Sequence, residues 1–169
     1  LFDFSGPSFA VDSACSSSLT AIHLALDSLY GGLCDAAIAG GVSLIVDPQH
    51  MIELSALGML SEGAECRSFG RNADGFVDAE GVGAVILKPL AQAVRDGDHI
   101  HAVIKASALN AGGRTHGYTV PNPVAQADVV STALARAGVD STDVSYLEAH
   151  GTGTALGDPI EVAGLTRAF

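Results

Sequence analysis

The fold is decided by the stretch "FAVDSACSSSLTAIHLALDSLYGG", from Phe9 to Gly32, in which an apolar run passes through one cysteine into a helical pattern. Phe9 to Val11 has the composition of a short strand. Beyond Cys15, apolar side chains recur near helical spacing until a Gly-Gly pair: Leu19, Ile22, Leu26 and Leu29. The sequence therefore predicts a strand that leads into a helix, with Cys15 at the junction.

Outside this stretch, strand-like and helix-like segments alternate along the chain. The strand-like segments are Asp35 to Val46, Gly81 to Leu90, His99 to Leu109 and Val144 to Ala149. The helix-like segments are Pro48 to Leu60 (a short helix and a loop), Pro89 to Gly97, Val124 to Ala137, and a last helix that starts at Asp158. No internal repeat or low-complexity linker divides them, so the alternation predicts an α/β layered fold.

The last helix has the most specific start signal in the chain. Asp158 is the predicted N-cap, and Pro159 follows at the first helical position. Glu161 stands three residues after the cap, as in a capping box. Local capping therefore explains these residues without any chemistry.

The charge balance excludes several classes of partner. The chain has 8 Lys and Arg against 19 Asp and Glu, which gives a formal net charge of −11. This charge repels phosphate backbones and anionic membrane surfaces, so we expect neither nucleic acid nor membrane as a partner. No signal-like segment opens the chain, and no apolar run reaches roughly 18 residues. We expect a cytoplasmic protein, and its 48% hydrophobic content predicts a substantial core.

The three cysteines predict neither a disulfide framework nor a zinc site, because their number is odd and no C-x-x-C spacing occurs. For Cys34 and Cys66 we favour buried packing, the commonest use of a free cysteine. Cys15 has two interpretations, a packing residue or a nucleophile. Its flanking hydroxyl and carboxyl residues favour the nucleophile, because a helix N-terminus stabilises a thiolate and offers amides to an oxyanion.

A second candidate is His150, which follows the strand-like segment Val144 to Ala149 and precedes a Gly/Thr loop. In α/β sheets, catalytic groups gather at the ends of strands, so a site shared with Cys15 is expected. Taken alone, the signal is weak, since His150 could simply bond a neighbouring carbonyl group. That simple interpretation is the better one for the histidines at four other positions, His23, His50, His99 and His101, and His116 stays undecided.

Four motifs occur together and in a fixed order. They are "VDSACSSSL" (Val11–Leu19), "NADGFVDAEGVGAVILK" (Asn72–Lys88), "GGRTHGYTVPNP" (Gly112–Pro123) and "EAHGTGTALGDPIE" (Glu148–Glu161). Across nearly the whole chain, this series resembles the β-ketoacyl synthase (ketosynthase) domain of modular type I polyketide synthases. "SFGRNADGF" (Ser68–Phe76) and the third motif resemble the trans-acyltransferase subtype, which is served by a free-standing acyltransferase.

The resemblance implies a thiolase-like fold of α-β-α-β-α layers in a homodimer, present here incompletely. Residues 1–88 would come from the N-terminal half and the rest from the C-terminal half. The family uses a second histidine, in a Gly-His pair, and a lysine, which we expect beyond Phe169. The chain is therefore expected to be an internal fragment, and we predict that the isolated fragment does not catalyse condensation.

The resemblance also implies the reaction and its partners. Cys15 would take an acyl chain from an acyl carrier protein, and a malonyl-type extender would then lose CO₂ and attack that thioester. His150 would donate a hydrogen bond to the extender's thioester carbonyl. Thr152 and Thr154 match positions along the carrier's phosphopantetheine arm, although loop hydroxyls bonding nearby backbone explain them equally well. No cofactor is expected to bind directly, and the other partners would be further polyketide synthase domains.

Two other functions are compatible with this resemblance. One is a non-elongating ketosynthase that only transfers acyl groups, and the presence of His150 weighs against it. The other is an inert partner subunit of the same fold, against which Cys15 argues because such subunits replace the cysteine. Acyl-chain length, product and carrier docking surface do not follow from this sequence.

Overall fold

The computed structural model describes residues 3–117 and 119–169, and the chain divides into two compact units. Unit 1 consists of Leu1–Ser43 and Glu80–Ile104. Unit 2 consists of Leu44–Ala79 and Lys105–Phe169. Cys15 therefore belongs to unit 1, whereas His150 and the loop that follows it belong to unit 2.

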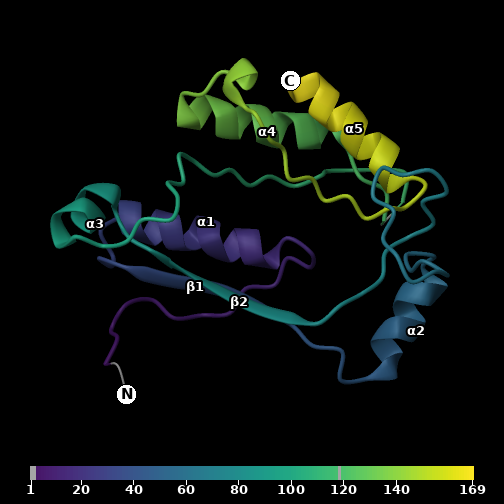
Figure 1. Ribbon diagram of the computed structural model, residues 1–169, viewed down its shortest axis with the longest axis horizontal. Coiled ribbons are helices and arrows are strands. Elements are labelled where there is room, and N and C mark those ends of the chain that lie inside the picture. Colours follow the sequence, from purple (N-terminus) through teal and green to yellow (C-terminus); the bar gives the residue numbers. More distant parts are fainter. Residues whose placement is uncertain (1–2, 118) are drawn as a thin grey trace. The chain divides into compact units, whose positions relative to one another are not determined.

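Unit 1 is a small sheet with helices. Its elements are α1 (Ser17–Tyr30), β1 (Ala37–Ser43), β2 (Gly81–Leu87) and α3 (Leu90–Asp96). The two strands pair antiparallel, with Ala37 opposite Leu87 and Ser43 opposite Gly81. Helix α1 lies along one face of this sheet (Figure 1), where Leu26 and Ala39 are buried. Of the apolar stripe predicted after Cys15, Leu26 is buried, whereas Leu19 is exposed.

A glycine sets how closely α1 approaches the sheet. Gly41 in β1 lies against Ser18 in the first turn of α1, and a Cβ atom at Gly41 would collide with the Ser18 hydroxyl. Gly83, which pairs with Gly41 across the ladder, has open space where its Cβ would be. Of these two glycines, only Gly41 is needed for this contact. Its lack of a side chain lets the start of α1 lie next to the sheet.

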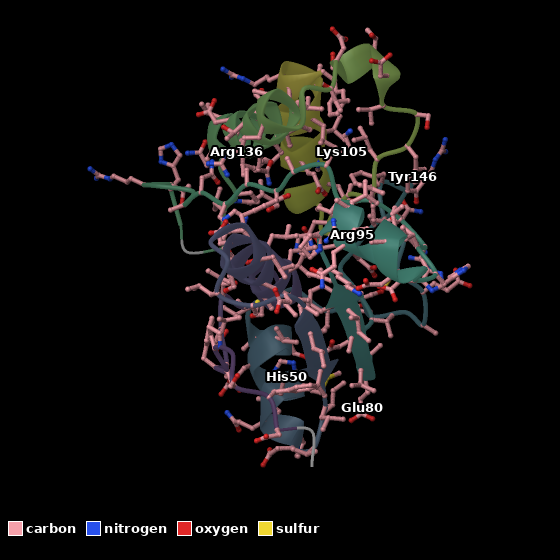
Figure 2. The ribbon with its side chains drawn as sticks, turned by 90° about the vertical axis from the view of Figure 1, so that its left-hand side faces the viewer. His50, Glu80, Arg95, Lys105, Arg136 and Tyr146 are labelled. Carbon is pink, nitrogen blue, oxygen red and sulfur yellow. The ribbon has the colours of Figure 1, made fainter. Side chains whose placement is uncertain are left out.

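Unit 2 contains α2 (Pro48–Ala56), α4 (Pro123–Ala137), the 3₁₀ turn η1 (Ser141–Asp143) and α5 (Gly157–Ala168). Helices α4 and α5 pack side by side (Figure 1). Arg136 of α4, labelled in Figure 2, donates from Nη1 to the Ser107 carbonyl at 3.0 Å and so ties the extended segment before the helix to α4. None of the helices within the described residues is both long enough and apolar enough to cross a membrane.

The five predicted helices occur where the sequence placed them, and for α2, α3 and α4 the local end signals also agree with the structure. Asn122 caps α4 by accepting from the Val124 and Ala125 amides, and Gly138 ends it at a φ of 62°. Gly97 ends α3 in the same left-handed conformation. The capping pattern of α2 is similar, with Asp47 accepting from the Gln49 amide at 2.7 Å.

Three predicted strands are wrong. Residues 9–11, 99–109 and 144–149 form no strand, although β1 and β2 occur where apolar runs predicted them. A strand needs a neighbour for its backbone hydrogen bonds, and within the described residues the sheet consists of β1 and β2 alone. At these places the apolar residues lie in chain that pairs with no other strand. Val103 and Leu147 are accordingly about half exposed, at 49% and 46%.

Candidate active site

The residue before Cys15 adopts an uncommon backbone conformation. Ala14 has a φ of 53°, a left-handed value that side-chain-bearing residues rarely adopt. The Asp12 carboxylate accepts from the Ala14 amide at 2.9 Å and supports this turn. Cys15, the next residue, is exposed. Such local strain is typical of functional sites.

Cys15 precedes the helix instead of capping it. Ser16 is the N-cap, α1 begins at Ser17, and the first intrahelical hydrogen bond runs from the Thr20 amide to the Ser16 carbonyl at 2.9 Å. The amides before Thr20 therefore lie at the positive end of the helix dipole, although those of Ser16 and Ser17 already donate to the Ser13 and Ala14 carbonyls. A thiolate or an oxyanion next to them is stabilised by the same partial charge.

Hydroxyl groups close the turn around Cys15. The Ser16 hydroxyl donates to both the carbonyl and the hydroxyl oxygen of Ser13, each at 2.9 Å. The Ser17 hydroxyl accepts from the Ser13 amide at 2.9 Å and donates to the Ala14 carbonyl at 2.6 Å. The hydroxyl residues that flank the cysteine in the sequence thus bond one another and the local backbone.

His150 is held by its backbone. The two carboxylate oxygens of Glu161, on α5, accept from the His150 amide at 2.6 Å and from the Gly151 amide at 2.8 Å. The Ser68 hydroxyl donates to the Gly151 carbonyl on the other side of the same segment. His150 itself is exposed, so its imidazole is open to a ligand while its main chain is fixed.

Asp158 joins the Gly/Thr loop to a distant segment. Its carboxylate is buried, with 5% exposure, and accepts from the Gly153 amide at 3.0 Å and the Phe69 amide at 2.5 Å. The predicted N-cap is therefore wrong, because Leu156 occupies that position and Asp158 lies inside α5. Glu161 likewise forms no capping box, since its carboxylate binds the His150 segment. Both carboxylates therefore bond to amides of other segments and cap no helix.

The loop after His150 passes very close to another backbone segment. Gly75 donates from its amide to the Gly153 carbonyl at 2.8 Å. Gly153 has a φ of 70°, and a Cβ there would lie 2.9 Å from the Gly75 carbonyl oxygen. Gly153 is required by this approach, whereas a side chain at Gly75 would meet the main chain of residues 59–61.

Thr152 and Thr154 lie together on this loop. Their hydroxyl oxygens are 3.1 Å apart, and the Thr154 hydroxyl also accepts from the Gly157 amide at 3.0 Å. Thr154 lines an open surface pocket of about 470 Å³ together with Phe69, Asn72 and Asp158. The structure thus gathers His150, Thr152 and Thr154 in unit 2, and Cys15 lies in unit 1. Within the described residues, no three His, Cys, Asp or Glu side chains gather as a metal would need.

Some residues of this region were missed or misjudged from the sequence. Ser68 and Phe69 contribute contacts to the His150 loop, and nothing in their local pattern predicts this. Cys66 is exposed, so its prediction as a buried packing residue is wrong. Its sulfur instead accepts from the Val77 amide at 3.1 Å. The Cys66 thiol therefore helps to hold the loop that leads toward β2.

Two family models match the chain. The one described as "Beta-ketoacyl synthase, N-terminal domain" matches residues 1–93, and "Beta-ketoacyl synthase, C-terminal domain" matches residues 101–169. The chain belongs to the β-ketoacyl synthase family. The resemblance carried by the four sequence motifs is therefore confirmed for this ketosynthase segment.

Similar proteins are polyketide synthases. The chain is 68% identical to polyketide synthase PksM and 58% identical to polyketide synthase PksL, both from Bacillus subtilis (strain 168). These matches cover 100% and 99% of the chain, which spans only 4% of the length of either relative. The ketosynthase segment therefore resembles a small part of very long proteins.

Solved ketosynthase structures match the segment closely. The oxazolomycin ketosynthase domain OzmH KS7 of Streptomyces albus JA3453 gives a TM-score of 0.97 at 52% identity, over 99% of this chain and 29% of that one. The ketosynthase from module 6 of the bacillaene synthase of Bacillus subtilis 168 gives 0.91 at 42% identity, over 94% and 28%. The predicted thiolase-like α/β fold is confirmed, and this ketosynthase segment forms part of it.

Proposed function

We propose that this segment supplies the nucleophile and one histidine of a β-ketoacyl synthase within a polyketide synthase. The observation that carries the proposal is the left-handed Ala14 turn, which exposes Cys15 just ahead of helix α1. A structural cysteine has no need of a strained turn beside it, whereas a nucleophile must be held where it can reach its substrate. Membership in the ketosynthase family supports the same assignment.

In the first step, the Cys15 thiolate attacks the thioester carbonyl of an acyl chain on an acyl carrier protein. A tetrahedral oxyanion forms, which backbone amides stabilise. It collapses with release of the carrier's phosphopantetheine thiolate, which then takes a proton. The acyl chain is left as a thioester on Cys15, which is open to solvent and so accessible to a carrier.

In the second step, a malonyl-type extender on an acyl carrier protein loses CO₂, and the bond electrons remain as an enolate. A hydrogen bond from the His150 imidazole to the extender's thioester carbonyl stabilises this enolate. The enolate carbon attacks the Cys15 thioester, and the Cys15 thiolate leaves. The product is a β-ketoacyl thioester that is two backbone carbons longer. The Glu161 contacts fix the main chain that carries this imidazole.

The proposal includes the surroundings of the site. Thr152 and Thr154 would line the phosphopantetheine arm, and the position of Thr154 on an open surface pocket supports this for Thr154. The working unit would be a homodimer in the cytoplasm, with other polyketide synthase domains and a free-standing acyltransferase as partners.

Residues 1–88 would belong to the N-terminal half of the domain. The motifs Ser68–Phe76 and Gly112–Pro123 support the subtype, although Tyr118 lies outside the described residues.

The two steps can be tested separately in a complete ketosynthase domain that contains these residues. His150→Ala should still accept an acyl chain on Cys15 but should form less β-ketoacyl product, because only the enolate loses its hydrogen bond. Product is measured by mass spectrometry after adding malonyl carrier to the preacylated domain. His101→Ala, at an exposed histidine of unit 1, is the matched control. Unchanged product in His150→Ala would rule out the histidine assignment.

A further inference from the structure

The turn that carries Cys15 is joined to helix α1 by a pair of hydroxyl groups. The hydroxyl oxygens of Ser13 and Thr20 lie 2.8 Å apart, so one donates to the other. Thr20 is half-buried on α1, and its amide makes the first intrahelical hydrogen bond, to the Ser16 carbonyl. The backbone of Thr20 is therefore part of the regular helix and gives the turn a fixed reference point.

Ser13 is the centre of the closed turn. Its hydroxyl and carbonyl oxygens accept from the Ser16 hydroxyl, and its amide donates to the Ser17 hydroxyl. Ser13 and Ser16 flank the Ala14–Cys15 pair on either side in the sequence. The Thr20 hydroxyl thus connects the hydroxyl groups of Ser13, Ser16 and Ser17 to a part of α1 beyond its first residue.

The turn needs such support because Ala14 is left-handed. An alanine in this conformation is strained, and it persists only where surrounding contacts hold it. If Ala14 relaxed to an ordinary φ, the chain direction at Cys15 would change and the thiol would move. Nucleophilic attack tolerates little displacement of the reacting atom.

We propose that Thr20 is a positioning residue for Cys15. Its hydroxyl acts through Ser13 to keep the Ala14 turn left-handed and the thiol oriented toward the acyl thioester. The inference rests on the proposed function of Cys15 as the nucleophile. Thr20 touches no reacting atom in this scheme, so its loss should slow chemistry without weakening carrier binding.

The test uses Thr20→Val in a complete ketosynthase domain, because valine keeps the shape of threonine and removes only the hydroxyl. Acylation of Cys15 by an acyl carrier protein is followed by quenched-flow mass spectrometry. We expect kcat for acylation to fall about tenfold with KM for the carrier unchanged. Thr20→Ser, which keeps the hydroxyl, should restore the rate.

The matched control is Ser28→Ala. The Ser28 hydroxyl donates to the Leu24 carbonyl at 2.9 Å, so this variant also loses a hydroxyl hydrogen bond from α1, but far from the turn. A wild-type rate in Thr20→Val, or an equal loss in Ser28→Ala, would overturn the proposal. If Thr20→Val does not fold, Ser13→Ala removes the same pair from the other side, and a wild-type rate there would also overturn it.

The nucleophile assignment is checked separately with Cys15→Ala. If acyl attachment survives in Cys15→Ala, the proposed function fails, whatever the Thr20 variants do. If attachment is lost in Cys15→Ala but Thr20→Val behaves as wild type, only the positioning inference fails.

Discussion

Glu161 holds His150 by its main chain: a carboxylate oxygen accepts from the His150 amide at 2.6 Å, and its second oxygen accepts from the next amide at 2.8 Å. Helix α5 thereby fixes the backbone that carries the imidazole while leaving the ring itself outside the contact. Two charge-assisted hydrogen bonds from one carboxylate are stronger than neutral ones and also restrict orientation. The geometry makes α5 a support for the candidate histidine.

Glu161→Gln should therefore impair condensation more than acylation. A glutamine side chain has one amide oxygen, and its NH₂ group would face the second main-chain N–H, so one hydrogen bond is lost. We expect the rate of condensation to fall about tenfold. Acylation of Cys15 should stay near the wild-type rate. The two rates are measured separately in a complete domain.

The control for this variant is Glu65→Gln, the same change at an exposed carboxylate of unit 2. It should leave both rates unchanged. An equal slowing of acylation and condensation in Glu161→Gln would show that Glu161 supports the whole domain and not the His150 segment in particular.

Asp158→Asn should destabilise the domain. The buried carboxylate accepts from two main-chain amides, and an asparagine could accept from only one of them, because its NH₂ group would face the other N–H. We expect the free energy of unfolding to fall by about 3 kcal/mol, measured by urea denaturation. Asp128→Asn, at an exposed position of α4, should cost little. A loss within error of the Asp128→Asn value would show that the Asp158 bridge contributes nothing.

Gly41→Ala should move or strain the start of α1, because the new Cβ meets the Ser18 side chain. The free energy of unfolding should fall by about 1–3 kcal/mol, the usual cost of overpacking. Gly83→Ala, across the same ladder, enters open space and should be neutral or slightly stabilising. Adding Ser18→Gly to Gly41→Ala should recover stability, and failure of this double variant to do so would contradict the contact.

Tyr146 should titrate above its ordinary range. The Tyr146 hydroxyl, labelled in Figure 2, donates to the Glu148 carboxylate at 2.5 Å, and this hydrogen bond and the carboxylate's charge raise the pKa of Tyr146 above 10.0. A raised pKa in the folded state means that the stabilisation is complete below pH 10.0 and is lost as the pH rises through the folded value. In Glu148→Gln, spectrophotometric titration should show the pKa of Tyr146 moving back toward 10.0. An unchanged titration curve would rule out the Glu148 effect.

Helix boundaries followed from the sequence because their determinants are local. Asn122 and Gly138 bound α4 by contacts within a few residues, so pattern and structure agree. Strands at 99–109 and 144–149 could not be judged in this way, since a strand exists only if a remote segment pairs with it.

The candidate site shows the same division. The helix that begins just after Cys15 was predictable from adjacent residues, and the role of Cys15 stays a prediction. Asp158 and Glu161 satisfied a local capping pattern, yet their carboxylates bind main-chain amides of other loops, one of them at Phe69. A spacing rule has no information about a contact across 89 positions of sequence. Such long-range contacts become visible only in the folded chain.

Peptide mapping by mass spectrometry shows directly whether Cys15 carries the acyl chain. A complete ketosynthase domain containing these residues is incubated with an acyl carrier thioester, digested and sequenced. We expect an acyl adduct on the peptide that contains Cys15, and no adduct in Cys15→Ala. An adduct on Cys34 or Cys66, or one that persists in Cys15→Ala, would contradict it.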